Sequence, residues 1–220
     1  MMNSDFDSLH QVLSLRMLTP TAYVLRVERK GLEFKAGQHL LLGRNGSIES
    51  REYSVYSTES DDFFEVLVKE VDDGLVSKQL KQLKAGDKVK LDGPLGFFTL
   101  EPETIANGKF LFIATGTGIS PFHSMVKSYP GLNYRLLHGV RYSNEAYDRQ
   151  DYEPSRYILC TTGDQGGDFY GRVTDFLRKN PVLKDTHCFL CGNFNMIHEA
   201  FEILEQQGVP SSQVHAEVYF

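Results

Sequence analysis

Thr115-Gly116-Thr117-Gly118 follows directly on the apolar run Phe110–Ala114, and this junction decides the fold of the second half of the chain. The apolar run is typical of a strand buried on both faces. After the glycines, Ser120 can cap a helix and Pro121 suits its first turn. Glycines at this place let a pyrophosphate approach the backbone at the positive end of the helix. The stretch therefore predicts a nucleotide-binding strand–loop–helix unit, although Pro121 stands where the third glycine of a G-x-G-x-x-G fingerprint would be.

Strands alternate with helices around this junction. Short, largely apolar runs predict strands at Phe110–Ala114, Arg135–His138, Tyr157–Cys160 and Cys188–Leu190. Helices are predicted between and after them, at Pro121–Lys127, Val173–Lys179 and Phe194–Gln207. Apolar residues at helical spacing predict that the buried face of the last helix carries Phe194, Ile197, Phe201 and Leu204. Gly208 and Pro210 then end this helix. The alternation indicates a parallel, doubly wound α/β sheet.

The first half of the chain has a different pattern, with short strands separated by glycine turns. A strand over Thr21–Val27 would place Tyr23, Leu25 and Val27 on one face. A single helical pattern interrupts the strands at Leu75–Lys84. Many short strands with regular turns predict a small antiparallel barrel. We therefore expect two domains, residues 1–103 and residues 108–220.

Composition limits the possible functions. The chain has 220 residues and a formal net charge of −6, which argues against general nucleic-acid binding because that requires a basic surface. No apolar run approaches the roughly 20 residues of a membrane span. The acidic N-terminus does not resemble a secretory signal. The three cysteines, Cys160, Cys188 and Cys191, are too few for a four-cysteine iron–sulfur site. We expect a cytoplasmic protein without a metal site.

Several short motifs stand in a fixed order along the chain. They are Arg51-Glu52-Tyr53-Ser54, Gly74-Leu75-Val76-Ser77, Gly93-Pro94-Leu95-Gly96-Phe97, the nucleotide loop, Cys191-Gly192-Asn193 and Glu217-Val218-Tyr219-Phe220. Together the motifs resemble the ferredoxin–NADP(+) reductase family of flavoproteins. The resemblance implies an antiparallel FAD-binding barrel followed by a five-stranded parallel NADP-binding domain, with the active site in the cleft between them. FAD is expected in place of FMN only because it is the usual cofactor of the family.

The first two motifs are expected to hold the flavin. In a strand, Arg51 and Tyr53 project to the same face, where a guanidinium can hold a pyrophosphate and a phenol ring can stack on a cofactor. The resemblance assigns these roles to the two residues and places Ser54 beside flavin N5. Backbone N–H groups at Gly74 and the hydroxyl of Ser77 form an anion site at a helix start. We also expect Lys69 to bind cofactor. Glu52 departs from the family, which often has proline at this position.

The nicotinamide coenzyme is expected at the loop of the second half, through Thr115, Gly116 and Gly118. The resemblance places Arg141 and Arg172 on the 2′-phosphate of NADP, with Thr162 beside them. Gly163 replaces an arginine that is common in bacterial members, and Asp164 follows it. NADP is therefore expected, with NAD as a possible alternative. The other interpretation of the two arginines is simple surface solvation.

The resemblance also assigns the end of the chain to catalysis. Cys191 is expected to contact the nicotinamide ring, although a buried structural cysteine is the alternative. Glu217 is expected to help position the nicotinamide. A terminal aromatic ring would cover the flavin, and this ring is either Tyr219 or Phe220. The alternative for this segment is an edge strand that packs its aromatic side chains into the core.

The resemblance implies an oxidoreductase that transfers hydride from NADPH to flavin N5 and then single electrons to ferredoxin or flavodoxin. An acidic electron carrier could dock near Lys78, Lys81 and Lys84, which belong to the densest basic cluster of an acidic protein. The closest rival is a reductase that serves an oxygenase, free flavin or a ferric chelate. A non-catalytic nucleotide-sensing module of the same fold is a third possibility, but the presence of Ser54, Cys191 and Glu217 argues against it.

Overall fold

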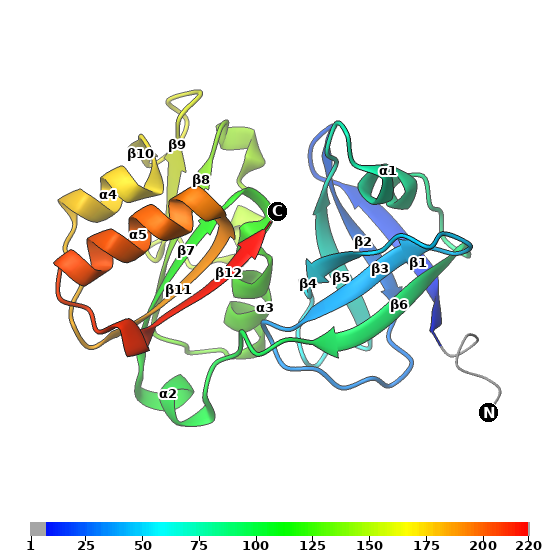
Figure 1. Cartoon of the computed structure of the whole chain (residues 1–220), viewed down its shortest axis with the longest axis horizontal. Helices are drawn as coiled ribbons and strands as arrows, with labels where there is room; N and C mark the ends of the chain where they lie inside the picture. Colours follow the sequence, from blue (N-terminus) through cyan, green and yellow to red (C-terminus); the bar gives the residue numbers. More distant parts are fainter. Residues whose placement is uncertain (1–7, 220) are drawn as a thin grey trace. The chain divides into compact units, whose positions relative to one another are not determined.

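The computed structural model describes residues 8–219 and divides into two compact units, Met1–Thr99 and Leu100–Phe220. Phe220, one of the two candidates for the covering ring, lies outside the described residues. Each unit is described separately below (Figure 1). No helix among residues 8–219 is long and apolar enough to cross a membrane.

The first unit is an antiparallel sheet that closes on itself. Its strands are β1 (Leu9–Met17), β2 (Ala22–Glu28), β3 (His39–Arg44), β4 (Arg51–Ser54), β5 (Phe63–Lys69) and β6 (Lys88–Leu95). They lie in the order β4-β3-β6-β1-β2-β5. A bridge between Val55 and Val66 joins the two outer strands, β4 and β5, so the sheet forms the predicted barrel.

Alternation along the strands fills the interior of the barrel. In β2, Tyr23, Leu25 and Val27 have no exposed surface and belong to one core cluster, as predicted. Helix α1 (Leu75–Lys81) contributes Val76 and Leu80 to the same cluster. The helix is shorter than the predicted segment Leu75–Lys84.

The second unit is a parallel sheet with helices on both faces. Its strands are β7 (Lys109–Thr115), β8 (Tyr134–Val140), β9 (Tyr157–Thr161), β10 (Phe169–Tyr170), β11 (Thr186–Asn193) and β12 (Val214–Tyr219). They lie in the order β10-β9-β8-β7-β11-β12, and all pairings are parallel. The four strands predicted by range are present as β7, β8, β9 and β11, β12 completes the five-stranded sheet that the resemblance implies, and the two-residue β10 adds a sixth strand at one edge. The C-terminal segment is a strand, β12, paired with β11.

Helices cover both faces of this sheet (Figure 1). Helix α3 (Ser120–Ser128) lies on one face, where Phe122 stacks on Phe112 of β7 with ring centroids 4.7 Å apart. Helices α4 (Val173–Lys179) and α5 (Phe194–Gln206) pack on the other face, against Leu111 and Ile113 of β7. The short helix α2 (Pro102–Asn107) precedes the first strand of the unit.

The predicted buried face of α5 was partly wrong. Ile197 and Leu204 are buried, but Phe194 is 58% exposed and Phe201 is 36% exposed. The buried stripe consists of Met196, Ile197, Ala200, Ile203 and Leu204. At 100° per residue these five positions form one continuous face of the helix, and Phe194 and Phe201 fall beyond its margin.

Candidate functional site

The strand order places a topological switch point between β7 and β11. From β7 the chain proceeds to β8 and β9 on one side, and later returns to β11 on the other side. Ligands of open α/β sheets bind at the carboxyl ends of the strands beside such a switch point. Here these ends are Thr115 of β7 and Gly192-Asn193 of β11. The Asn193 backbone N–H donates to the Thr115 hydroxyl at 3.0 Å, so the two strand ends are joined directly.

The nucleotide loop packs closely against the end of β11. A Cβ atom at Gly118 would lie 2.3 Å from the carbonyl oxygen of Cys191, and one at Gly192 would lie 2.2 Å from the Thr115 hydroxyl oxygen. Both distances are shorter than any real contact, so these glycines are required by the packing of the two loops on each other. At Gly116, by contrast, a Cβ atom would meet nothing within 4 Å. The space beside the loop is therefore open at Gly116 and closed at Gly118.

The candidate 2′-phosphate residues follow the carboxyl ends of β8 and β9. Arg141 directly follows β8, Thr162 directly follows β9, and Arg172 directly precedes α4, and all three residues are exposed. The Arg141 guanidinium lies 5.4 Å from the ring centroid of Tyr142. The structure thus brings the three residues to the edge of the sheet that carries the nucleotide loop.

Gly163 is packed under the backbone of Arg141. Its N–H donates to the Arg141 carbonyl at 2.7 Å, and a Cβ atom would lie 2.7 Å from that oxygen and 3.0 Å from Arg141 Cγ. An arginine at this position, as many bacterial members have, would therefore collide with Arg141 in the present backbone. Restoring this arginine would therefore require the backbone around Gly163 and Arg141 to shift, besides adding a charge.

Asp164 closes the turn after β9. Its carboxylate accepts hydrogen bonds from the Ser143 N–H and hydroxyl, both at 2.9 Å, and from the Gly166 N–H at 3.1 Å. These bonds, led by the one from the Ser143 backbone, lower the pKa of Asp164. The carboxylate is thus used to hold the turn that carries Gly163 against the segment after Arg141.

The three candidate catalytic residues of this unit share one face of the sheet. In the pairing of β11 with β12, Cys191 lies opposite Glu217 and Asn193 lies opposite Tyr219. Cys191 has no exposed surface, and burial raises the pKa of its thiol well above the usual value. The charge of Glu217 raises this pKa further, whereas a hydrogen bond with Tyr219 opposes the shift. The thiol is therefore neutral, and it can act by contact but not as a thiolate nucleophile.

In the first unit, Arg51 and Tyr53 share a face of β4, as strand alternation predicts. They pair with Leu42 and Leu40 of β3. The Arg51 side chain is 63% exposed, and its contacts are the Ser50 carbonyl at 2.8 Å and Glu49 at 3.5 Å. Burial raises the pKa of Tyr53 to about 12, and the positive charge of Arg51 opposes this shift. The guanidinium therefore lies beside a half-buried phenol ring and keeps most of its donors toward solvent.

Ser54 lies on the opposite face of β4 from Tyr53. It is 2% exposed and pairs with His39 of β3. The neighbouring Glu52 is exposed, with its carboxylate 4.0 Å from His39 Nε2. Glu52, at a position where the family often has proline, thus places an exposed carboxylate next to Ser54, on the face of β4 away from Arg51.

The start of α1 lies near Tyr53. The Tyr23 hydroxyl donates to the Ser77 carbonyl at 2.6 Å, and Tyr53 is one of the groups that raise the pKa of Tyr23. The Ser77 hydroxyl accepts a hydrogen bond from the Val71 N–H at 3.2 Å and lies against Gly74, the N-cap of α1. Lys69 is exposed at the end of β5, just before this turn. The expected flavin residues thus gather at β4 and around the turn between β5 and α1.

Comparison with known proteins agrees with this arrangement. The family model described as oxidoreductase FAD-binding domain matches residues 18–100, and the one described as oxidoreductase NAD-binding domain matches residues 112–201. Ferredoxin–NADP reductase B of Sorangium cellulosum is 28% identical, over 95% of this chain and 96% of that protein. The reductase component of propane 2-monooxygenase from Gordonia is also 28% identical, over 94% of this chain but 66% of that protein.

A solved structure gives the same result. A ferredoxin NADP(+) reductase from Neisseria gonorrhoeae, crystallised with FAD and NADP, superposes with a TM-score of 0.82. It is 26% identical, over 96% of this chain and 98% of that one. This chain belongs to the ferredoxin–NADP(+) reductase family. It is an oxidoreductase with one flavin-binding and one nicotinamide-binding domain, which confirms the prediction of FAD with NADP or NAD.

The residues of this reductase fit both groups. The open space at Gly116, beside a loop at a helix start, suits a pyrophosphate. The exposed donors of Arg51 suit the phosphates of a flavin dinucleotide, and Tyr53 offers a ring for stacking. The individual roles of these residues stay predictions.

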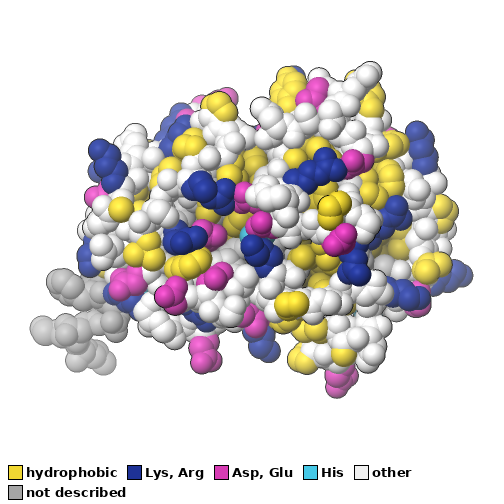
Figure 2. Space-filling model, turned by 180° about the vertical axis from the view of Figure 1, so that it is seen from behind, with side chains coloured by type: hydrophobic (Ala, Val, Ile, Leu, Met, Phe, Trp, Pro, Cys, Tyr) yellow, Lys and Arg dark blue, Asp and Glu magenta, His cyan; other side chains and the backbone are white. Residues whose placement is uncertain are grey.

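The expected docking lysines are partly neutralised. Lys81 pairs with Glu70 at 2.5 Å and also donates to the Pro20 carbonyl, while Lys78 donates to the Asp72 carbonyl. Lys84 is exposed. On the face shown in Figure 2, basic and acidic side chains are interspersed. A docking surface at these lysines would therefore present less charge than the sequence suggests.

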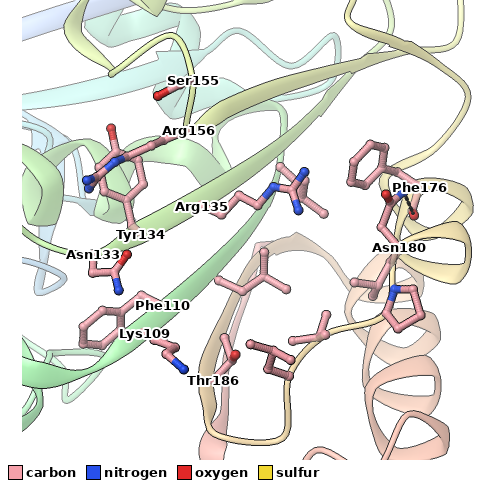
Figure 3. A pocket seen from close by; sticks show the side chains of 16 residues that line it. Lys109, Phe110, Asn133, Tyr134, Arg135, Ser155, Arg156, Phe176, Asn180 and Thr186 are labelled. Carbon is pink, nitrogen blue, oxygen red and sulfur yellow. Dashed lines mark hydrogen bonds between the residues drawn. The ribbon is translucent and has the colours of Figure 1, made fainter.

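A pocket of about 390 Å³ lies at the opposite end of the parallel sheet from the nucleotide loop (Figure 3). Residues at or just before the amino ends of strands line it, among them Lys109, Asn133 and Arg156. None of the predicted site residues lies there. The pocket is therefore separate from the candidate coenzyme site.

Sequence reasoning missed the buried polar side chains beneath the nucleotide loop. The sequence pattern predicts His138 only as the end of one strand and Tyr157 only as the start of another. His138 has no exposed surface and hydrogen-bonds to Tyr157 and to Gly116. A histidine within an otherwise apolar strand was the available signal, because a buried polar group needs a partner.

Proposed function

We propose that this protein oxidises NADPH and passes the electrons one at a time to ferredoxin or flavodoxin. The observation that carries the proposal is the position of Arg141 and Arg172 at the carboxyl edge of the parallel sheet, in a chain that matches ferredoxin–NADP reductases over nearly their whole length. When bound, FAD supplies the hydride acceptor at N5 and the one-electron chemistry, while the protein supplies position and charge.

In this proposal the first unit holds the flavin. Arg51 binds the phosphates through its exposed guanidinium, and Tyr53 packs against the flavin ring. Backbone N–H groups at Gly74 and the side chains of Ser77 and Lys69 complete the phosphate site. Ser54 is the group nearest the hydride-accepting nitrogen. The closeness of Tyr53 to the start of α1 supports this grouping.

The second unit holds the coenzyme. The loop Thr115–Gly118 receives the pyrophosphate, and Arg141, Thr162 and Arg172 receive the adenosine ribose with its 2′-phosphate. Cys191 and Glu217 orient the nicotinamide ring. A neutral buried thiol suits this role, because it offers contact area without a competing charge.

The electron carrier would be acidic and would dock beside Lys78, Lys81 and Lys84. Since Lys81 already pairs with Glu70, Lys84 is the strongest of the three candidates. Attraction of this kind acts mainly on the rate of association and weakens with salt.

A second candidate function is a reductase component of an oxygenase. The 28% identity to the propane 2-monooxygenase component favours it, since this equals the identity to the Sorangium reductase. The two candidates share the oxidation of the coenzyme and differ in the electron acceptor.

Anaerobic reduction of the purified flavoprotein tests the proposal. NADPH and NADH are added in parallel, and the reduced protein is then titrated with ferredoxin, flavodoxin and a ferric chelate. Faster reduction by NADPH together with rapid electron transfer to ferredoxin or flavodoxin would support the first candidate. A flavin that NADPH does not reduce, or a protein that binds no flavin, would refute it.

A further inference from the structure

A buried chain of hydrogen bonds runs from β9 through β8 to the nucleotide loop. The Tyr157 hydroxyl lies 2.7 Å from His138 Nδ1, and His138 Nε2 lies 2.9 Å from the Gly116 carbonyl oxygen. A carbonyl can only accept, so Nε2 carries the proton. Nδ1 is then an acceptor and Tyr157 donates to it. The donor and the acceptor of both hydrogen bonds are therefore fixed.

The His138 imidazole, in the middle of this chain of hydrogen bonds, is neutral. His138 has no exposed surface, and burial lowers its pKa to about 4. The hydrogen bond to Gly116 and the charge of Glu145 act in the opposite direction but do not overcome burial. The ring therefore serves as a fixed donor to Gly116 at neutral pH.

The Tyr157 end of the chain is held by its own neighbours. The Arg149 guanidinium lies 5.2 Å from the Tyr157 ring centroid and pairs with Asp168 at 2.7 Å. Asp168 also accepts the Leu159 N–H at 2.8 Å. The Tyr152 ring packs beside Tyr157, with centroids 5.1 Å apart. The Tyr157 ring, which carries the donor hydroxyl, is thus held by its packing against Arg149 and Tyr152.

Gly116 begins a short 3₁₀ helix (Gly116–Ile119), and the bond from His138 holds the carbonyl of its first residue. Gly116 has φ +54°, and its carbonyl points to His138 in the sheet interior. In a planar trans peptide, the C=O and the following N–H point in opposite directions. The Thr117 N–H is therefore directed away from His138. In this way a buried side chain sets the direction of a loop amide.

We propose that His138, supported by Tyr157, is the positioning residue that orients the Gly116–Thr117 peptide toward the coenzyme pyrophosphate. The inference rests on the proposed function, because it assumes a dinucleotide at this loop. The pyrophosphate is common to NADPH and NADH, whereas the 2′-phosphate belongs to NADPH alone. Loss of the His138 bond should therefore weaken both coenzymes by the same factor, unlike loss of Arg141 or Arg172.

Binding of NADP(+) and NAD(+) to the flavin-loaded protein is measured by calorimetry for four proteins. They are wild type, His138→Phe, His138→Gln and, as a matched control, His123→Gln. The control alters another buried histidine of the same unit, whose Nε2 hydrogen-bonds to Asp151 at 2.8 Å. Melting temperatures are recorded alongside, so that loss of fold is separated from loss of binding.

His138→Phe should weaken both coenzymes about tenfold, which corresponds to about 1.4 kcal/mol. His138→Gln should recover most of this loss, because its amide can donate to Gly116 and accept from Tyr157. His123→Gln should lower the melting temperature without changing either dissociation constant. If His138→Phe does not fold, Tyr157→Phe is used, and it should weaken both coenzymes equally but by less.

Equal binding by wild type and by folded His138→Phe, or by Tyr157→Phe where that variant replaces it, would overturn the inference. A loss confined to NADP(+) would also overturn it, since the chain would then act on the 2′-phosphate side. If wild type itself binds neither coenzyme, the proposed function fails and the inference fails with it. The wild-type measurement thus separates the two failures.

Discussion

The two candidate binding regions are built in different ways. Around β4 and α1, most of the groups expected to meet the flavin are side chains, and Arg51 among them is 63% exposed with few internal contacts. Around the loop after β7, the groups expected to meet the coenzyme pyrophosphate are backbone atoms held by tight packing at Gly118 and Gly192 and by the buried His138. The flavin region depends on exposed side chains, and the coenzyme region depends on the packing of the buried residues beneath the loop.

This difference determines how each region responds to substitution. A change in an exposed side chain removes one interaction with the ligand and leaves the fold intact. A change beneath the nucleotide loop alters the backbone, so that binding and stability fall together. The following predictions test this contrast.

The largest effect should come from Gly118→Ala. Its Cβ atom would lie 2.3 Å from the Cys191 carbonyl oxygen, which cannot move without shifting the end of β11. Overpacking of this kind should cost about 3 kcal/mol. At about 2–4 °C per kcal/mol, thermal unfolding should shift down by about 6–12 °C, with loss of coenzyme binding.

Gly116→Ala is the matched control for this change. Its Cβ atom meets nothing within 4 Å, and the cost is limited to the positive φ, on the order of 1 kcal/mol. An unfolding temperature equal for the two variants would contradict the packing argument.

The buried His138 should make stability depend on pH. Its pKa in the folded protein is about 4, against 6.5 in the unfolded chain, so between these values only the unfolded chain binds the proton. The neutral ring contributes its full stability above pH 6.5 and loses it as the pH falls toward 4. The loss should reach about 3 kcal/mol.

Chemical unfolding between pH 7 and 4 checks this prediction. His138→Gln removes the titrating group, so its stability should fall less steeply than that of wild type. The groups that face the ring are the Tyr157 hydroxyl, the Tyr147 ring and the charge of Glu145, and the substitution retains all three. His215, whose pKa is also lowered, titrates in both proteins and cancels in the comparison. Parallel pH profiles would contradict the prediction.

Arg51→Ala tests the flavin region, which depends on exposed side chains. Loss of a charge-assisted hydrogen bond to phosphate should cost about 1.5–3 kcal/mol, or about one to two decades in flavin affinity. The fold should stay intact, because the side chain makes few internal contacts. The ratio of flavin to protein after purification measures the effect. Lys88→Ala, an exposed cation on β6 of the same unit, should retain full occupancy.

The same contrast explains how much of the fold and of the candidate site could be predicted from the sequence. The alternating strands and the order of the motifs were sufficient for both halves of the fold, because period and turn residues are local properties. The same-face relation of Arg51 and Tyr53 also follows from strand alternation and is observed. Exposed site residues on regular elements are therefore accessible to sequence reasoning.

The interior beneath the nucleotide loop was not accessible in this way. The bond from His138 to Gly116 joins residues 22 positions apart, and the collision of Gly163 with Arg141 depends on two loops that meet only in the folded protein. The margin of α5 was mispredicted for a similar reason, since the neighbouring elements decide which apolar side chains are covered. Such features depend on tertiary packing and have no local pattern.

Coenzyme choice should show a smaller, selective effect. Replacing Arg141 and Arg172 together with alanine should raise KM for NADPH about tenfold or more and leave KM for NADH nearly unchanged, because only NADPH carries the 2′-phosphate. Steady-state kinetics with both coenzymes check this. Equal effects on the two would indicate that the arginines serve the shared pyrophosphate or the fold.

Gly163→Ala sharpens the same prediction. A Cβ atom 2.7 Å from the Arg141 carbonyl oxygen would displace that residue, so the variant should lose preference for NADPH although no charge is removed. Gly163→Arg should behave in the same way. A gain in NADPH preference for Gly163→Arg would show that the loop can rearrange to accept the side chain.

The smallest expected effect concerns the cysteines, and it tests whether the second unit is as closed as its packing indicates. All three thiols are buried, and burial raises the pKa values of Cys160 and Cys188 to about 12 and that of Cys191 well above its usual value. With a pKa near 12, about one thiol in ten thousand is ionised at pH 8, and the thiolate is the reactive form. Iodoacetamide at pH 8 should therefore leave the folded protein unmodified by mass spectrometry, while the unfolded protein takes up three labels. Rapid labelling of Cys191 alone would show that the end of β11 opens to solvent. The coenzyme region would then be exposed, as the region around Arg51 is.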